Sequence, residues 1–213
     1  MTQVKRLQKI MRERGIEAIL LSSTLNQRYI TNFNYDDGYV VVFQDKAFLQ
    51  TDFRYIEAAN AQVNHEDFEI ITPKGHLKSV ASLALDNGVK TILVEESALS
   101  LEDLASFEKA AEGTVNYVGG ASAILTEMRM VKTEDELNNM AEAQRITDAA
   151  FSHIISVLRP DMTEIDVALE IEFFMRKNGA ERTSFDTIAV SGTASSMPHG
   201  VPRNVKLDRK SVV

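Results

Sequence analysis

Short apolar runs alternate with amphipathic helical patterns through the first 113 residues, and this alternation limits the possible folds more than any other feature. The first pair consists of a helical stripe over residues 4–14, ended by Gly15, and an apolar run over residues 16–21. A hairpin follows, because turn residues 44–46 separate two further apolar runs. Strands and helices that alternate at this spacing predict an α/β domain whose sheet is largely covered.

The rest of the first domain is expected to follow the same scheme. A capping box that begins at Ser100 predicts a helix that stops at Gly113. We place the end of the domain near residue 120, where two glycines stand together, and expect residues 1–120 to fold independently. The other predicted elements are strands over residues 39–43, 47–50, 68–71 and 91–94, and helices over residues 52–61 and 76–86.

A different pattern begins at residue 133, where a second capping box starts a long helical stripe. Pro160 must end this helix, because proline lacks the backbone donor and clashes with the preceding turn. A second helix, a strand and a loop of small residues are then expected at residues 163–178, 184–190 and 191–196. We therefore predict a domain over residues 1–120, a linker over residues 121–132 and a partial second domain over residues 133–213.

Composition and charge exclude several functional classes. The chain has no cysteine, so disulfides, thiolate metal sites and cysteine nucleophiles are impossible. Its formal charge of −8, without a local basic patch, argues against binding to nucleic acid or to an anionic membrane surface. The sequence begins without an apolar leader and no apolar run reaches the length of a membrane span, so we expect a cytoplasmic protein.

Four histidines remain as candidates for chemistry. His153 lies inside the long predicted helix, where a hydrogen-bonded structural role is the simpler interpretation, and the turn positions of His65 and His76 indicate surface residues. His199 has a different setting, because small residues precede it and Pro198 fixes the backbone just before the imidazole. Its spacing alone leaves two interpretations open, an incidental histidine in a polar loop or a side chain presented to a ligand.

Several short motifs around His199 and upstream of it form an ordered series along the chain. They are Asn26–Ile30, Thr51–Tyr55, Lys132–Leu137, Arg159-Pro160 with Thr163-Glu164, Asn178–Ala180, and Ser184–Gly192 with Ser196–Gly200. As an ordered series they resemble the Xaa-Pro dipeptidases and aminopeptidases P of the pita-bread metallopeptidase family, which carry a creatinase-like N-terminal domain. The resemblance covers residues 4 to about 207, although Asn32 replaces a glycine that is common in relatives.

The resemblance implies an α/β (α+β) fold, in which a creatinase-like N-terminal α/β domain precedes the first part of a pita-bread catalytic domain. It also implies a hydrolase that cleaves the bond between an N-terminal residue and a following proline. The implied substrate is a peptide or dipeptide with proline at the second position. Two divalent cations, commonly Mn²⁺ or Co²⁺, are the implied cofactors, and a homodimer is the implied assembly of the full-length protein.

The same resemblance limits what this chain can supply. The metal ligands of the family are two aspartates, a histidine and two glutamates that all follow the Pro-His-Gly loop, so we expect a C-terminally truncated chain without a metal ligand. Neither Glu181 nor Asp186 is expected to bind metal. His199 is the one catalytic residue that carries over, and its imidazole is expected to contact the substrate near the scissile carbonyl and to stabilise the charged intermediate. The chain alone is therefore expected to be inactive.

Two other functions stay open at this point. A metal-free relative would use the same fold to bind a protein partner or a small molecule, and a creatinase-like enzyme would hydrolyse creatine without a metal. A partial second domain should also leave apolar faces uncovered, for example at Ile188, at Val190 and on the inner stripe of the helix over residues 133–158. We expect that region to be loosely packed or prone to aggregation. Residues 208–213 depart from the family pattern, and our hypothesis is read-through of a sequencing adapter.

Overall fold

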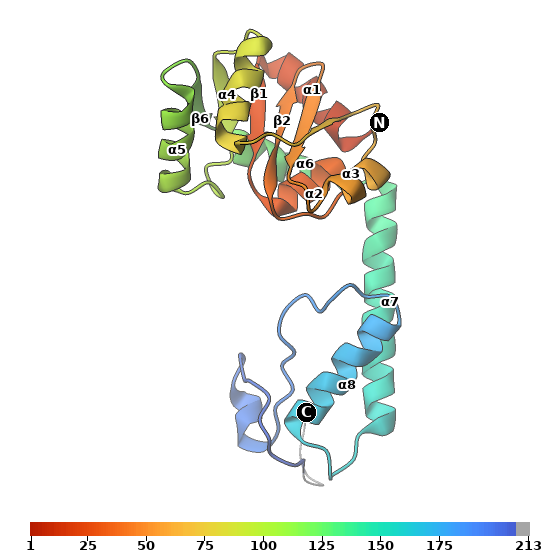
Figure 1. Ribbon diagram of the computed structural model, residues 1–213. Coiled ribbons are helices and arrows are strands. Elements are labelled where there is room, and N and C mark those ends of the chain that lie inside the picture. Colours follow the sequence, from red (N-terminus) through yellow and green to blue (C-terminus); the bar gives the residue numbers. More distant parts are fainter. Residues whose placement is uncertain (208–213) are drawn as a thin grey trace. The chain divides into compact units, whose positions relative to one another are not determined.

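The computed structural model describes residues 1–207 of the chain, and our hypothesis about residues 208–213 lies outside them. The chain forms two compact units, Met1–Val131 and Lys132–Val213, and each is described by itself (Figure 1). None of the helices in the described part of the chain has the length and apolar character needed to span a membrane.

The first unit is built on a six-stranded mixed sheet with the strand order β4-β3-β2-β1-β5-β6. Its central strand β1 pairs with β2 in antiparallel and with β5 in parallel orientation, so that Ala18 lies opposite both Phe43 and Ile92. The strands are β1 (Ala18–Leu21), β2 (Gly38–Phe43), β3 (Ala47–Thr51), β4 (Glu69–Ile71), β5 (Thr91–Val94) and β6 (Asn116–Gly119).

Helices cover both faces of this sheet (Figure 1). Successive residues of β1 point to opposite faces, so Ile19 and Leu21 join one apolar cluster whereas Ala18 and Leu20 join the other. All four are fully buried, which confirms the predicted α/β fold with a covered sheet. The first cluster contains α1 (Gln3–Arg14), α2 (Thr24–Thr31), α3 (Ile56–Gln62) and α6 (Ala121–Met130), and the second contains α4 (His76–Asp86) and α5 (Leu101–Ala111).

The segment expected to be a linker, residues 121–132, is instead occupied by helix α6, which belongs to the first unit. Ala121, Ile124, Leu125 and Met128 are buried in the cluster that also holds α1 and α2. These residues recur at helical spacing, and of the two glycines before them Gly119 ends β6 and Gly120 caps α6, so neither ends the domain. The linker prediction is therefore corrected, and the first unit extends to Val131.

Helix α2, which the sequence pattern did not predict, is anchored by the fully buried Glu95 just after β5. One carboxylate oxygen accepts hydrogen bonds from the backbone nitrogens of Ser22 at 2.6 Å and Ser23 at 2.9 Å. The other accepts from the side-chain amide of Asn26, whose own oxygen accepts from Arg129 of α6 at 2.8 Å. A single carboxylate thus joins the end of the sheet, the start of α2 and, through Asn26, helix α6.

Replacement of Glu95 by glutamine should destabilise the first unit by about 2–4 kcal/mol, because the amide keeps only one acceptor oxygen, so its NH2 group must face either the Asn26 side-chain amide or the two backbone donors. Two measurements on the whole chain give this loss of stability: urea denaturation, and hydrogen exchange of the sheet amides in the native state. Glu102→Gln is the matched control, since it makes the same change at an exposed position in α5. Equal stability of the two variants would contradict the anchoring role of Glu95.

The second unit begins with two helices, α7 (Glu134–Val157) and α8 (Glu164–Lys177), that confirm the predicted pair. His153 on α7 contacts Glu170 on α8 at 2.6 Å, and its ring stacks on Phe174 with 4.3 Å between the ring centres. His153 is therefore hydrogen-bonded within the helix pair, as predicted. A small apolar cluster holds the rest of the unit against these helices and contains Ile154, Met162, Val167, Ala189 and Leu207.

The strand predicted at residues 184–190 does not form in the described part of the second unit. A strand needs a neighbour for its ladder of hydrogen bonds, and none of the described residues of this unit forms a strand that could pair with it. Ile188 is 43% exposed, as predicted, but Val190 is buried at 7%, so the prediction that Val190 is uncovered was wrong.

The inner stripe of α7 is likewise only partly uncovered. Leu137 and Met140 near its start are 55% and 56% exposed. Ala150 and Ile154, further along the same helix, are buried at 1% and 7%. Exposed apolar surface on α7 therefore includes its first turns, and Phe151 and Ile155 further along the helix are also exposed, at 67% and 60%.

Candidate functional site

The loop that carries His199 is closed at its base by one buried carboxylate, that of Glu164 at the start of α8. Glu164 is 1% exposed. Its Oε1 accepts hydrogen bonds from the backbone nitrogen of Ser191 at 2.7 Å and from the Ser191 hydroxyl at 2.8 Å. Arg203 donates from Nη2 to Oε1 at 2.6 Å, from Nε to Oε2 at 2.8 Å and from its backbone nitrogen to Oε2 at 2.9 Å. Both ends of the loop therefore meet at one side chain.

We call the contacts of Glu164 with Ser191 and Arg203 the clamp, and its electrostatics keep Glu164 ionised. The Arg203 guanidinium holds the pKa of the Glu164 carboxyl far below its usual range, and the two Ser191 donors act in the same direction, against the burial that opposes charge. The carboxylate in turn raises the pKa of Arg203. A planar guanidinium that binds both oxygens is the strongest arrangement for such a pair. The charged form of Glu164 is thus built into the folded unit.

The backbone adds further ties at the end of the loop. The backbone nitrogen of Glu164 donates to the carbonyl of Val205 at 3.1 Å, and the backbone nitrogen of Leu207 donates to the carbonyl of Met162 at 2.9 Å. Leu207 is also part of the apolar cluster under the two helices. The chain after the loop is therefore held against the start of α8 by main-chain and side-chain contacts.

Gly200, the residue next to His199, is packed directly against the start of the loop. A Cβ at this position would lie 2.8 Å from Cγ1 and 3.0 Å from Cγ2 of Val190, closer than atoms normally approach. Only glycine allows this contact without a shift of its neighbours. The Pro-His-Gly motif is thus fixed at its glycine end as well as at its proline.

His199 itself lies in an exposed turn. Within residues 1–207 its imidazole makes no hydrogen bond or ion pair. The other histidines lie elsewhere: exposed His65 contacts the carbonyl of Asn60 at 2.9 Å. His76 is partly buried and contacts Gln50 at 3.4 Å, so its prediction as a surface residue holds only in part.

The acidic residues considered as ligands do not form a metal site with His199. Glu181 and Asp186 are both exposed. Across residues 1–207 there is no group of three or more histidine, aspartate or glutamate side chains placed to hold a metal ion. The donor set that two hard cations need is therefore not assembled by the described residues.

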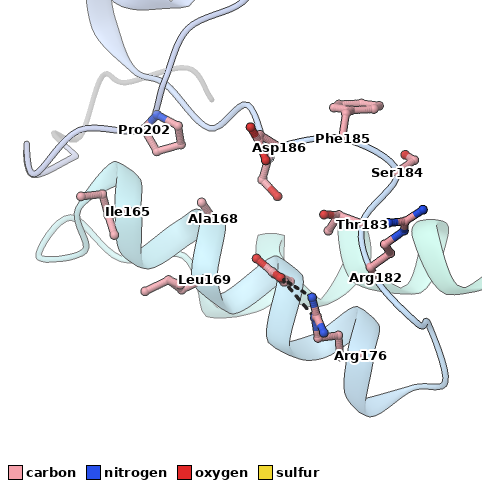
Figure 2. A pocket seen from close by; sticks show the side chains of 12 residues that line it. Ile165, Ala168, Leu169, Arg176, Arg182, Thr183, Ser184, Phe185, Asp186 and Pro202 are labelled. Carbon is pink, nitrogen blue, oxygen red and sulfur yellow. Dashed lines mark hydrogen bonds and ion pairs between the residues drawn. The ribbon is translucent and has the colours of Figure 1, made fainter. Parts of the chain in front are cut away.

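An open groove of about 530 Å³ lies elsewhere in the second unit, between α8 and the segment that follows it (Figure 2). Figure 2 shows Ile165 and Ala168 of α8 on one side and Asp186 and Pro202 on the other. Arg176 pairs with Glu172 along the helix at 3.0 Å. His199 is not among the residues that line the groove, so the groove and the histidine are separate features. The remaining lining residues are Leu169, Arg182, Thr183, Ser184, Phe185 and Thr187.

Both units of the chain match known protein families. The first unit matches the creatinase/prolidase N-terminal domain over residues 3–131, which is more than half of the chain. The chain belongs to the creatinase/prolidase family. Residues 138–213 match metallopeptidase family M24, so the clamp and His199 of this creatinase/prolidase chain lie within its M24 region. The predicted resemblance and domain types are confirmed.

Individual relatives agree with this assignment. The chain is 35% identical over 212 residues to the uncharacterized peptidase YqhT of Bacillus subtilis, and the match covers 99% of this chain and 59% of that protein. An Xaa-Pro dipeptidase structure from Bacillus anthracis matches with a TM-score of 0.87 at 34% identity, over 98% of this chain and 57% of that one. An X-Pro aminopeptidase structure from Thermotoga maritima gives 0.88 at 30% identity, over 99% and 59%. The chain thus spans less than two thirds of these relatives.

Glu164 and Arg203 were not predicted as site residues. Glu164 stands in a motif that carried the resemblance, but its sequence setting is that of an ordinary acidic residue in the first turn of a helix. The nearby Asp166 has the same setting, yet it is exposed and completes the capping box with Thr163. Local spacing does not separate the two carboxylates. Only the tertiary contacts show which of them is buried against the loop.

Proposed function

We propose that the protein represented by this creatinase/prolidase chain hydrolyses the bond before a proline at the second position of peptides or dipeptides. The observation that carries the proposal is the exposed His199 on a clamped loop inside the M24 match. Relatives named Xaa-Pro dipeptidase support the proline specificity. A cytoplasmic homodimer is part of the same proposal.

We propose that His199 acts as a hydrogen-bond donor to the substrate. An imidazole N–H directed at the scissile carbonyl would bind its oxygen more strongly as negative charge develops there, which lowers the barrier to hydrolysis. A fixed loop suits this role, because the donor must already stand where the charge forms. In this account His199 orients and stabilises, and it does not generate the nucleophile.

Two divalent cations, Mn²⁺ or Co²⁺, are the cofactors that the family assignment implies, and M24 is by its description a metallopeptidase family. The described residues do not fit such a pair, since no suitable donor group occurs among them. We therefore propose that the metal ligands belong to the part of the relatives' length that this chain does not span. It follows that the 213-residue chain alone should not hydrolyse peptides.

The test compares two proteins under the same conditions. One is the 213-residue chain, and the other is a chimera in which its residues 1–207 are followed by the remainder of the Bacillus subtilis relative. With Mn²⁺ added, the chimera should hydrolyse glycyl-proline at least about 100-fold faster than glycyl-alanine, while the chain alone should hydrolyse neither.

Three outcomes would count against the proposal. Equal rates on the two dipeptides would remove the proline specificity. Turnover by the 213-residue chain alone would show that its own residues hold the metals. Hydrolysis of creatine by the chimera, without turnover of either dipeptide, would favour the creatinase-like alternative.

A further inference from the structure

The Glu164 carboxylate accepts hydrogen bonds from the loop and not from its own helix. The start of α8 is already capped, because Thr163 accepts from the Asp166 backbone nitrogen at 3.1 Å and the Asp166 carboxylate accepts from the Thr163 backbone nitrogen at 2.7 Å. Glu164 instead receives five hydrogen bonds, all from Ser191 and Arg203. Loss of its carboxylate should therefore loosen the loop before it affects α8.

The two partners of Glu164 define a closed segment of the chain. Ser191 and Arg203 are 12 residues apart in sequence, and Arg203 also reaches the Ser191 carbonyl at 3.4 Å. His199 lies between them, and its neighbour Gly200 packs on Val190 beside the clamp. A segment closed at both ends and held once more near its tip has few conformations left to it.

We propose that Glu164 is the positioning residue for His199, because its buried carboxylate closes the segment from Ser191 to Arg203 and so fixes where the imidazole stands. The inference rests on the proposed function only for what His199 does to a substrate. The positioning itself is a property of the 213-residue chain and is measurable without any turnover.

The experiment uses ¹⁵N relaxation and hydrogen exchange on the whole chain and its Glu164→Gln variant. In the wild type the backbone order parameter of His199 should be about 0.85, and in the variant it should fall below about 0.6. The amides of Ser191 and Arg203, which donate to the carboxylate, should exchange about 100-fold faster. The amides within α7, and those of α8 after its first turn, should be unchanged, whereas the backbone nitrogens of Glu164 and Ile165 donate to carbonyls of Val205 and Arg203 and should respond with the loop.

Glu172→Gln is the matched control, since it makes the same substitution on the same helix and removes only the exposed pair with Arg176. This control should leave the order parameter of His199 at its wild-type value. Unchanged order at His199 in a folded Glu164→Gln variant would overturn the proposal. Equal loosening in the control would overturn it as well, because the loop would then respond to any change on α8.

A second variant covers the case in which Glu164→Gln unfolds the unit. Arg203→Lys keeps the positive charge but loses the planar fork, so His199 should become mobile to an intermediate degree. Wild-type order at His199 in this variant would contradict the clamp. The outcome is independent of the peptidase proposal: a loop that loosens as expected, in a protein whose turnover does not need His199, would refute the catalytic role and leave the clamp intact.

Discussion

Replacement of Gly38 by alanine should prevent the first unit from forming its six-stranded sheet. Gly38 begins β2 with φ of 131°, and a Cβ there would lie 1.9 Å from the carbonyl oxygen of Gln50 on β3. The clash is with backbone, so no side-chain movement relieves it. Since β2 and β3 lie inside the sheet, the cost should exceed about 4 kcal/mol.

Far-UV circular dichroism and urea denaturation of the Gly38→Ala chain measure this effect. Gly88→Ala is the control, because Gly88 also has positive φ, 69°, but an added Cβ there would meet no atom within 4 Å. The control should lose only about 1 kcal/mol. The same urea midpoint for the two variants would show that the close approach at Gly38 does not affect the free energy of unfolding.

Much of the fold was predictable because its signals are local. The β2–β3 hairpin and helices α7 and α8 carry their caps, stops and periodicity within their own residues. Helix α2 was missed although Ser23 caps its start locally, because its residues show no clear helical period and its anchor, Glu95, lies about seventy residues away along the chain. The predicted strand at residues 184–190 failed for a related reason, since a ladder depends on a partner strand.

Asn32 shows how structure explains a departure from the family pattern. It ends α2 with φ of 56°, in the left-handed region. Glycine adopts this conformation freely, and asparagine is one of the few other residues that tolerate it. The replacement that weakened the resemblance at sequence level is therefore compatible with the same helix end.

The candidate site was predictable only at its exposed tip. The small residues and proline before His199 are visible in the sequence and indicate a presented side chain. The clamp is not visible, because Glu164, Ser191 and Arg203 come together only in the folded unit. The sequence therefore predicts the residue that would meet a substrate, whereas the structure shows what holds it in place.

Replacement of His199 by alanine in the metal-loaded chimera should lower kcat by about 100- to 1,000-fold, because a donor to the developing negative charge is lost. KM should change less, since the hydrogen bond is stronger in the transition state than in the ground state. His65→Ala is the control, because His65 is an exposed histidine of the first unit whose ring is hydrogen-bonded to the Asn60 carbonyl. It should keep the wild-type rate.

The most direct test of this account is the initial rate of glycyl-proline hydrolysis by the Mn²⁺-loaded chimera and its His199→Ala variant, with both proteins shown to be folded by circular dichroism. The account predicts turnover by the parent chimera and a kcat about 100- to 1,000-fold lower in the variant. A folded His199→Ala variant that hydrolyses the dipeptide at the parent rate would contradict it.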